Sequence, residues 1–306
     1  MLHGVRSSTR DCYSSAQKKY IQFCAWYDLS PFPASMNTIL LYIAYMNTQG
    51  LSASTMSVYL SSIRSAHVMA GYQEPNIRSP QVKLALKAIK DNSAPPLQKK
   101  PIVYTMLKQM ISVLNNESNA IMWSAMLSLA FFAGLRGAEY AMVSLNSGHM
   151  YPCLSHIQFA TVDNTKVMYY QVQSAKTNVH GYKVPVGCTG AYVCAYCMML
   201  RYVKHQFSTM ADPHMPLFVF QNGQVVSKNH VNLLIKKLVA KLGYNVADYS
   251  THSIRAGAAS TAAAMGFNDW EIMRLGGWRS AAYRSYIRSV DSHVAGLSAR
   301  LVTTPL

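Results

Sequence analysis

The chain of 306 residues is 50% hydrophobic and 11% aromatic, which is enough to bury a core of ordinary size and excludes a disordered protein. Lys and Arg number 28 against 12 Asp and Glu, and the formal net charge of +16 favours phosphate-rich partners, nucleic acid before an anionic membrane surface. The most apolar run, residues 120–135, is shorter than the roughly 20 residues of a membrane span. Because no apolar signal segment opens the sequence, we expect an intracellular protein whose six cysteines are reduced thiols.

The first part of the chain predicts a small all-helical domain, residues 1–90, of four or five helices. Apolar side chains recur there at helical spacing in residues 9–29, 35–50, 52–71 and 79–90. Residues 91–101 contain two adjacent prolines and are predicted to be a linker to a second domain, residues 102–306. Residues 1–90 hold nine Lys or Arg and three Asp or Glu, so the charge of this part is +6 and the remainder carries +10. Two basic lobes are what a clamp around a duplex requires.

The second part changes character after a predicted buried helix at residues 120–135. Short segments rich in β-branched and aromatic residues, separated by turn residues, predict a three-stranded antiparallel sheet from residues 154–160, 166–173 and 182–186. Helical patterns then resume at residues 191–206, 227–242, 252–265, 269–275 and 279–288. We therefore expect a mainly α fold with a small antiparallel sheet, an α+β class.

One helix start, in the sequence THSIRAG at residues 251–257, carries two polar groups in a setting of small residues. His252 and Arg255 lie three apart and are therefore neighbours on one helix face. Ser250 or Thr251 can cap this helix, whose free N–H groups attract an anion. Taken alone, such a pair is more often a solvated arginine beside a packed histidine.

Other residues along the chain favour a functional site. Arg136 and Glu139 are also three apart, at the end of the predicted buried helix. Lys176 lies at the turn between the second and third predicted strands. Trp278 follows the THSIRAG helix, and Tyr286 comes eight residues after it. The ordered set is much more specific than any one of its members.

This set resembles the active site of the tyrosine recombinases, the lambda-integrase-like family, and the resemblance covers nearly the whole chain. Residues 1–90 look like the SAM-like core-binding domain of that family, and residues 102–306 look like its catalytic domain. The closing stretch, residues 271–301, is similar to Cre-type recombinases. The phrases GLSASTMSVYLSSIRSAH and HSIRAGAASTAAAMG look more like recombinases of eukaryotic DIRS and Crypton mobile elements, which would act in the nucleus.

The resemblance assigns phosphate binding to two arginines. Arg136 and Arg255 match the active-site arginines of the family, and Glu139 matches the acidic residue that supports the first. Breaking a phosphodiester without a metal requires neutralisation of the charge on a five-coordinate phosphorane, and planar guanidinium groups offer fixed donors for its non-bridging oxygens. We therefore expect no metal and no cofactor in the reaction.

The resemblance assigns the other matching positions to the attacking and leaving oxygens of the cleavage reaction. Tyr286 matches the nucleophile, and His252 is its proton acceptor or orienting partner. Lys176 matches the hairpin lysine that protonates the leaving 5′ oxygen, and Trp278 can donate one N–H bond and wall the site. A covalent phosphotyrosine keeps the energy of the broken bond, so rejoining needs no ATP. The sequence thus predicts an enzyme that cleaves and rejoins double-stranded DNA at a recombination site.

Two of these assignments have a neighbouring alternative. Tyr283 lies one turn from Tyr286 on the same predicted helix, and the spacing from Trp278 favours Tyr286. Lys183 could replace Lys176 if the turn is displaced by a few residues. A type IB topoisomerase, which relaxes supercoils as a monomer, would use the same residues. A retired recombinase that only binds DNA would form no covalent adduct.

Metal sites are the less favoured interpretation of two other groups. Cys188, Cys194 and Cys197, with His180 and His205 nearby, could suggest zinc, but no second close-spaced pair accompanies them and buried thiols are favoured. A two-metal nuclease or transposase needs converging carboxylates, and only 12 acids are scattered along the chain. Two of these acids, Asp269 and Glu271, lie in the first turn of a predicted helix, where a carboxylate interacts favourably with the helix dipole.

The carboxyl-terminal tail, residues 289–306, predicts assembly. Val290, Val294, Leu297 and Leu301 recur at helical spacing and form an apolar stripe that a short helix cannot bury by itself. We expect the tail to dock on a neighbouring catalytic domain, although docking within its own chain is an alternative. Cyclic exchange of the tail would link a homo-tetramer around two duplexes, as the resemblance also implies.

Overall fold

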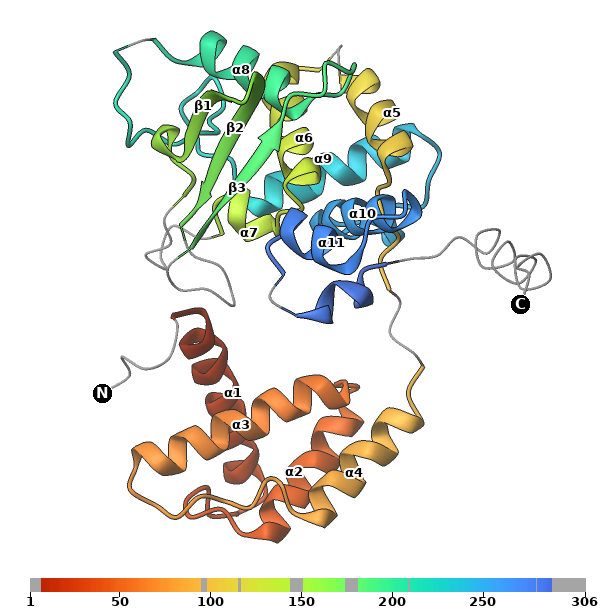
Figure 1. Ribbon diagram of the computed structural model, residues 1–306. Coiled ribbons are helices and arrows are strands. Elements are labelled where there is room, and N and C mark those ends of the chain that lie inside the picture. Colours follow the sequence, from red (N-terminus) through yellow and green to blue (C-terminus); the bar gives the residue numbers. More distant parts are fainter. Residues whose placement is uncertain are drawn as a thin grey trace, which may run out of the picture. The chain divides into compact units, whose positions relative to one another are not determined.

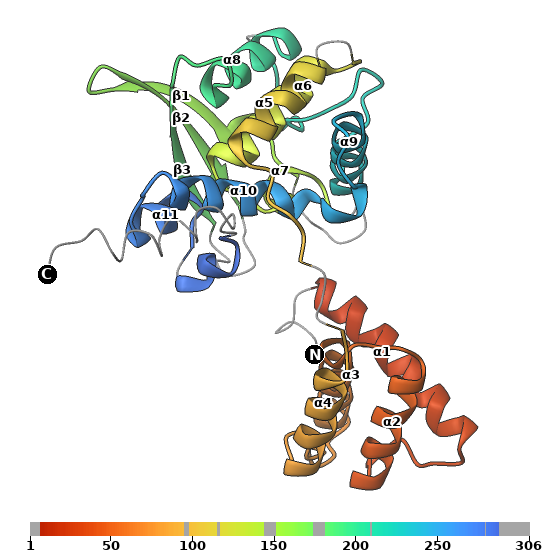
Figure 2. The ribbon, with the colours of Figure 1, turned by 90° about the vertical axis from the view of Figure 1, so that its right-hand side faces the viewer.

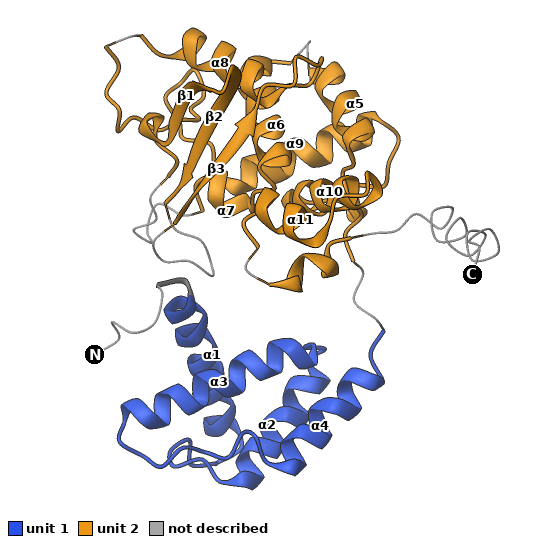
Figure 3. Cartoon of the chain, in the orientation of Figure 1, with its two compact units in different colours: residues 1–96 blue, residues 97–306 orange. Residues whose placement is uncertain are grey.

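The computed structural model (Figure 1, turned by 90° in Figure 2) describes residues 7–94, 98–114, 117–143, 151–173, 181–208, 210–278 and 280–287. The chain forms two compact units, residues 1–96 and 97–306 (Figure 3). The boundary between them falls within residues 91–101, the stretch that contains the paired prolines. Within the described part of the chain, no helix has both the length and the apolar character of a membrane span.

The described part of unit 1 is a bundle of four helices, three of which begin after a capping serine. Its helices are α1 (Ser7–Trp26), α2 (Met36–Thr48), α3 (Ala53–Met69) and α4 (Pro80–Asp91). Ser35, Ser52 and Ser79 each cap the following helix, because the side-chain oxygen accepts a hydrogen bond from the N–H three residues later. The apolar faces of the helices meet in one core, which includes Tyr20, Phe23, Tyr42, Ile43, Met56 and Leu60.

Unit 2 is built around α6, a helix that is buried on nearly all sides. The helices of this unit are α5 (Tyr104–Leu114), α6 (Ala120–Phe132), α7 (Gly137–Tyr140), α8 (Ala195–Gln206), α9 (Lys228–Lys241), α10 (Thr251–Ala264) and α11 (Asp269–Leu275). Around α6 pack α5, α8 and α10, and α9 packs against α5 and α10. This arrangement explains why the sequence of α6 is apolar without a polar face.

A three-stranded antiparallel sheet covers one side of the helices. Its strands are β1 (Ile157–Val162), β2 (Thr165–Val172) and β3 (Tyr182–Gly187), in the order β1-β2-β3. Asp163 and Asn164 both have positive φ, which gives the two-residue turn between β1 and β2 the twist that a hairpin needs. Alternate residues of β2 and β3 are buried, and α8 packs against both strands. The predicted fold class, mainly α with a small antiparallel sheet, is confirmed.

Two predicted elements begin several residues later in the structure than in the sequence prediction. The first strand begins at Ile157 and not at 154, because the N–H groups of Leu154 and Ser155 bond to carbonyls at 215 and 213 and hold a 3-10 turn, η1 (Leu154–His156). Helix α8 begins at 195 and not at 191, because the hydroxyl of Thr189 and the thiol of Cys194 accept backbone hydrogen bonds in the preceding turn. A second 3-10 turn, η2 (Val246–Asp248), precedes α10.

The predicted helix 279–288 is wrong as an α-helix. The chain forms a 3-10 turn there, η3 (Ala281–Ser285), and Ser280 caps it. Trp278 and Tyr283 both pack into a small apolar cluster against α10 and α11, and this packing outweighs the local preference for a longer helix. The tail, residues 289–306, lies outside the described residues, as does Lys176.

Candidate active site

The small residues of α10 allow this helix to pack against backbone, and the packing places Arg255 in the interior. Ser250 caps the helix by accepting a hydrogen bond from the N–H of His252 at 3.2 Å. A Cβ on Gly257 would lie 1.8 Å from the carbonyl oxygen of Ile102, so only glycine permits the observed approach. Two residues earlier, Arg255 has an exposed fraction of 0%, whereas His252 on the same helix is exposed.

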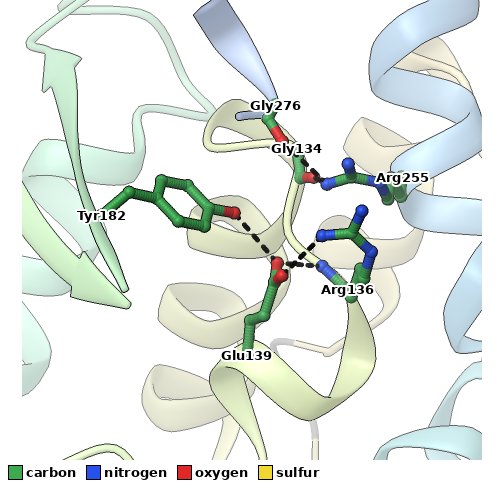
Figure 4. A network of polar contacts seen from close by, with 6 residues as sticks. All are labelled: Gly134, Arg136, Glu139, Tyr182, Arg255 and Gly276. Carbon is green, nitrogen blue, oxygen red and sulfur yellow. Dashed lines mark hydrogen bonds and ion pairs between the residues drawn. The ribbon is translucent and has the colours of Figure 1, made fainter. Parts of the chain in front are cut away.

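Arg255 is held by backbone carbonyls, not by a carboxylate. Its Nη1 donates hydrogen bonds to the carbonyl oxygens of Gly134, after α6, and Gly276, after α11. Figure 4 shows these two glycines converging on the guanidinium group. Within the described residues, the Nε and Nη2 atoms of Arg255 have no hydrogen-bond partner although they are buried. Burial, and then the charge of Arg136, lower the pKa of Arg255.

Such a group is energetically unfavourable in the protein alone. A buried charge with unpaired donors is costly unless an opposite charge compensates it. An oxyanion that accepts from Nε and Nη2 would provide the missing partner. The interior position of Arg255 therefore indicates an anion-binding site.

The second guanidinium group, that of Arg136, is fixed by Glu139. Arg136 precedes the short helix α7 and donates from Nη1 to Oε1 of Glu139 at 2.8 Å, and its backbone N–H donates to Oε2 at 2.8 Å. The hydroxyl of Tyr182 donates to the same Oε2 at 3.2 Å (Figure 4). Burial and the Glu139 carboxylate raise the pKa of Tyr182 above its usual range, so the hydroxyl stays a donor. The Glu139 side chain is 2% exposed and that of Arg136 is 21% exposed, which leaves Arg136 accessible to a ligand.

Aromatic rings surround the Arg255 guanidinium on the side of α11 and η3. Its Cζ lies 3.9 Å from the ring centroid of Trp278 and 5.7 Å from that of Tyr286, both within the range of cation–π contacts. The rings of His252 and Tyr286 are 5.1 Å apart between centroids. The Nε1 atom of Trp278 is buried and, like two donors of Arg255, has no partner among the described residues.

The structure distinguishes Tyr286 from Tyr283. Tyr283 is 1% exposed and lies in the cluster against α10 and α11. Tyr286 is half-buried at the end of η3, beside the exposed His252. Its position is held through the backbone, because the Ser260 hydroxyl donates to the Tyr286 carbonyl oxygen at 3.2 Å. Tyr286 is thus the better placed of the two to meet a ligand.

The structure brings together six of the seven predicted site residues, which are Arg136, Glu139, His252, Arg255, Trp278 and Tyr286. The seventh, Lys176, lies outside the described residues. Its alternative, Lys183, is engaged elsewhere on the sheet, with Nζ donating to Oε1 of Gln158 at 3.1 Å and lying 4.2 Å from the Tyr169 ring centroid.

Sequence reasoning identified Glu139 but missed the other supports of the two arginines. Tyr182 begins β3 and, by strand alternation, shares the face of Val184 and Val186, but its contact with Glu139 spans 43 residues of sequence. The carbonyls of Gly134 and Gly276 carry no signal that distinguishes them from other backbone groups. The nearest sequence signal is the glycine itself, because a Cβ on Gly276 would lie 1.8 Å from the Trp278 ring.

Comparison with known proteins places this geometry in a family. Residues 104–293 match the phage integrase family. The chain belongs to this family. It is 24% identical over 282 residues to an integrase/recombinase XerD homolog of Selenomonas ruminantium, over 87% of this chain and 77% of that protein. It is 23% identical over 309 residues to the Cre recombinase of Escherichia phage P1, over 92% of this chain and 84% of Cre.

Solved structures show the same fold at low sequence identity. A lambda integrase dimer bound to a COC′ core site matches with a TM-score of 0.61 and 14% identity, over 93% of this chain and 90% of that chain. The Tn1549 transposon integrase in complex with circular intermediate DNA matches with a TM-score of 0.54 and 15% identity, over 88% of this chain and 86% of that chain. The predicted resemblance to tyrosine recombinases is confirmed, and the chain is an enzyme of that class.

Proposed function

We propose that this recombinase cleaves a DNA strand through a 3′-phosphotyrosyl intermediate and rejoins it to a new partner, without metal or ATP. The observation that carries the proposal is the buried Arg255: two of its donors, Nε and Nη2, have no partner in the described part of the chain, and its guanidinium lies 5.7 Å from the Tyr286 ring centroid. A scissile phosphate supplies the anion that these donors lack. The similar proteins are recombinases and integrases, and the two solved structures among them contain DNA, which supports DNA as the substrate.

The arginines act on the charge of the transition state. Arg255 and Arg136 donate to the non-bridging oxygens, and the charge on these oxygens grows as the phosphorane forms. Glu139 keeps the Arg136 fork oriented, since both carboxylate oxygens are bonded to Arg136 and one also to Tyr182. The N–H of Trp278 is a further donor to the phosphate.

The covalent step exchanges one phosphate ester for another. The Tyr286 oxygen attacks phosphorus, a phosphotyrosyl bond forms, and the bond to the 5′ oxygen breaks. A tyrosine hydroxyl has a pKa of about 10, so it must lose its proton as it attacks. His252, next to the Tyr286 ring, is the acceptor or orienting partner, and Lys176 delivers a proton to the leaving oxygen. Attack by a 5′ hydroxyl of another strand reverses the step and releases the enzyme.

Metal-free adduct formation tests this proposal. The substrates are nicked duplexes built from short repeats in the DNA that flanks the gene, because loss of the short cleaved fragment traps the adduct. In EDTA, we expect a covalent complex of protein and DNA that survives denaturing electrophoresis. Magnesium and zinc are each added back in separate reactions. An adduct that forms with magnesium, but neither in EDTA nor with zinc, contradicts the mechanism.

The proposal also includes the role of the helical domain in DNA binding and the compartment in which the enzyme acts. Residues 1–90 serve as the core-binding domain. This domain, with a charge of +6, and the catalytic part, which is also basic, bind opposite sides of a duplex. The enzyme works on DNA, in the nucleus if its host is eukaryotic, as expected for a DIRS or Crypton element. A type IB topoisomerase would relax supercoiled plasmid as a monomer, and a retired recombinase would bind DNA without an adduct, so the same assay separates these alternatives.

Deletion of residues 290–306 is expected to abolish the synaptic complex and to leave binding to a single DNA site largely unchanged. The physical reason is the apolar stripe of Val290, Val294, Leu297 and Leu301, which a neighbouring catalytic domain would bury. Mass photometry on DNA-bound protein measures the tetramer population. An unchanged tetramer population in the deletion variant would refute exchange of the tail between protomers.

A further inference from the structure

Three cysteines that are separate in the sequence meet at the junction of β3 and α8. Cys188 follows the last residue of β3, Cys194 caps the start of α8, and Cys197 lies in the first turn of that helix. The Sγ atom of Cys188 lies 3.6 Å from that of Cys197 and 3.8 Å from that of Cys194. All three sulfurs are within 4.8 Å of one another.

These distances suit a shared metal ion. Zinc binds thiolate sulfur at about 2.3 Å with tetrahedral angles, so two sulfurs on one zinc lie about 3.8 Å apart. Three thiols that only fill a hydrophobic core do not need to be arranged around one shared point. Two of these three are not core groups either, because Cys197 is exposed and Cys188 is half-buried. The expectation of buried thiols therefore fits only Cys194.

The surrounding turn orients the sulfurs. The N–H of Thr189 donates to Sγ of Cys194 at 3.3 Å, and a hydrogen bond of this kind orients a thiolate toward a metal ion. Gly190 has φ +66°, a left-handed conformation that reverses the chain between β3 and α8. The N–H of Cys188 donates to the carbonyl oxygen of Lys166 at 2.8 Å, which ties the cluster to β2. The geometry of the three sulfurs is thus set by backbone on both sides.

A basic cavity adjoins the cluster. Cys188 and Cys197 line a cavity of about 580 Å³ together with Lys166, Arg201 and Lys204. A zinc ion with three thiolates has a net charge of −1, which these cations would offset. Within the described residues, no other Cys, His, Asp or Glu has its ligand atom in this close group, although His205 lines the same cavity. The fourth position of a zinc ion would therefore open to the cavity.

We propose that Cys188, Cys194 and Cys197 form a three-thiolate zinc site that fastens the end of β3 to the start of α8. The site is separate from the proposed reaction, which uses no metal. Tyr182, which supports Glu139, begins the strand that ends at this site. The zinc ion would therefore stabilise the sheet that carries one support of the catalytic arginine.

Metal binding to the purified full-length chain tests the site. After reduction, loading with zinc and dialysis against metal-free buffer, we expect one zinc per chain by plasma mass spectrometry. Cobalt in place of zinc should give thiolate-to-cobalt charge-transfer bands and the intense visible bands of a tetrahedral ion. The thermal midpoint of unfolding should rise with zinc, because an ion that binds only the folded chain stabilises it.

Variants of the two cysteines that are not fully buried identify the ligands without disturbing the core. Cys188→Ser and Cys197→Ser should each weaken zinc binding at least tenfold, since even the loss of a group that only orients a metal ligand costs about that much. Cys12→Ser and Cys153→Ser, at free cysteines outside the cluster, should bind like the unaltered chain. Two results would overturn the proposal. One is that the Cys188→Ser/Cys197→Ser double variant retains as much zinc as the unaltered chain. The other is that the reduced, unaltered chain binds no zinc.

Discussion

Replacement of Tyr286 by phenylalanine is expected to abolish covalent attachment to DNA completely while DNA binding persists. The substitution removes only the hydroxyl oxygen that would attack phosphorus, and the ring remains to pack beside Trp278 and His252. The backbone contact from Ser260 is also preserved, so the fold of the segment should not change. The measurement is adduct formation on a nicked duplex in EDTA, with a mobility-shift assay on the same DNA for binding.

Tyr283→Phe is the matched control, because it removes the same atom one turn away. Tyr283 is buried in the cluster against α10 and α11, and its hydroxyl contacts two exposed side chains, Arg284, whose Nε donates to it at 3.5 Å, and Asp269. Contacts with exposed charged groups carry little energetic weight. This variant should retain adduct formation. If Tyr286→Phe still forms the adduct and Tyr283→Phe does not, the nucleophile is misassigned.

Replacement of Lys176 by alanine is expected to lower cleavage of ordinary DNA by about 10²-fold or more, the usual scale of general-acid catalysis. The leaving 5′ oxygen departs poorly as an alkoxide and needs a proton. A sulfur atom at the same bridging position departs readily as a thiolate without one. On a substrate with a 5′-bridging sulfur, the deficit of Lys176→Ala should therefore largely disappear. Cleavage rates of single-turnover reactions on the two substrates measure this.

Arg136→Ala and Arg255→Ala provide the contrast. They remove stabilisation of the phosphorane, which both substrates need, so they should stay defective with either leaving group. Lys183→Ala controls for the nearby lysine, whose side chain contacts Gln158 and Tyr169 on the sheet, and should cleave normally. If sulfur does not rescue Lys176→Ala, or rescues the arginine variants equally, Lys176 is a phosphate contact and the acid lies elsewhere.

Local patterns were enough for most helices. The apolar spacing and the capping serines predicted the four helices of unit 1, because a helix start is decided by the side chain of one residue and the N–H groups just after it. The segment 269–275 was predicted with the bounds of α11, where Asn268 accepts from the N–H of Glu271 at 3.0 Å. The predictions failed where a backbone partner comes from far along the chain, as at η1, which bonds to the loop at 213–215.

The sequence by itself determined the fold class, the family and the order of the candidate site residues, because those depend on residue types at fixed spacings. Only the tertiary structure decided how those residues differ in environment. His252 and Arg255 share a helix face, yet one is exposed and the other is fully buried against carbonyls 121 and 21 residues away. The same holds for the sulfurs of Cys188 and Cys194, brought to 3.8 Å by a turn with one left-handed glycine. The burial of Arg255 and the convergence of the thiols arise from contacts between segments that are distant in the sequence. The energy of an unpaired guanidinium group or of a thiol cluster depends on those contacts and not on the spacing of residues along the chain.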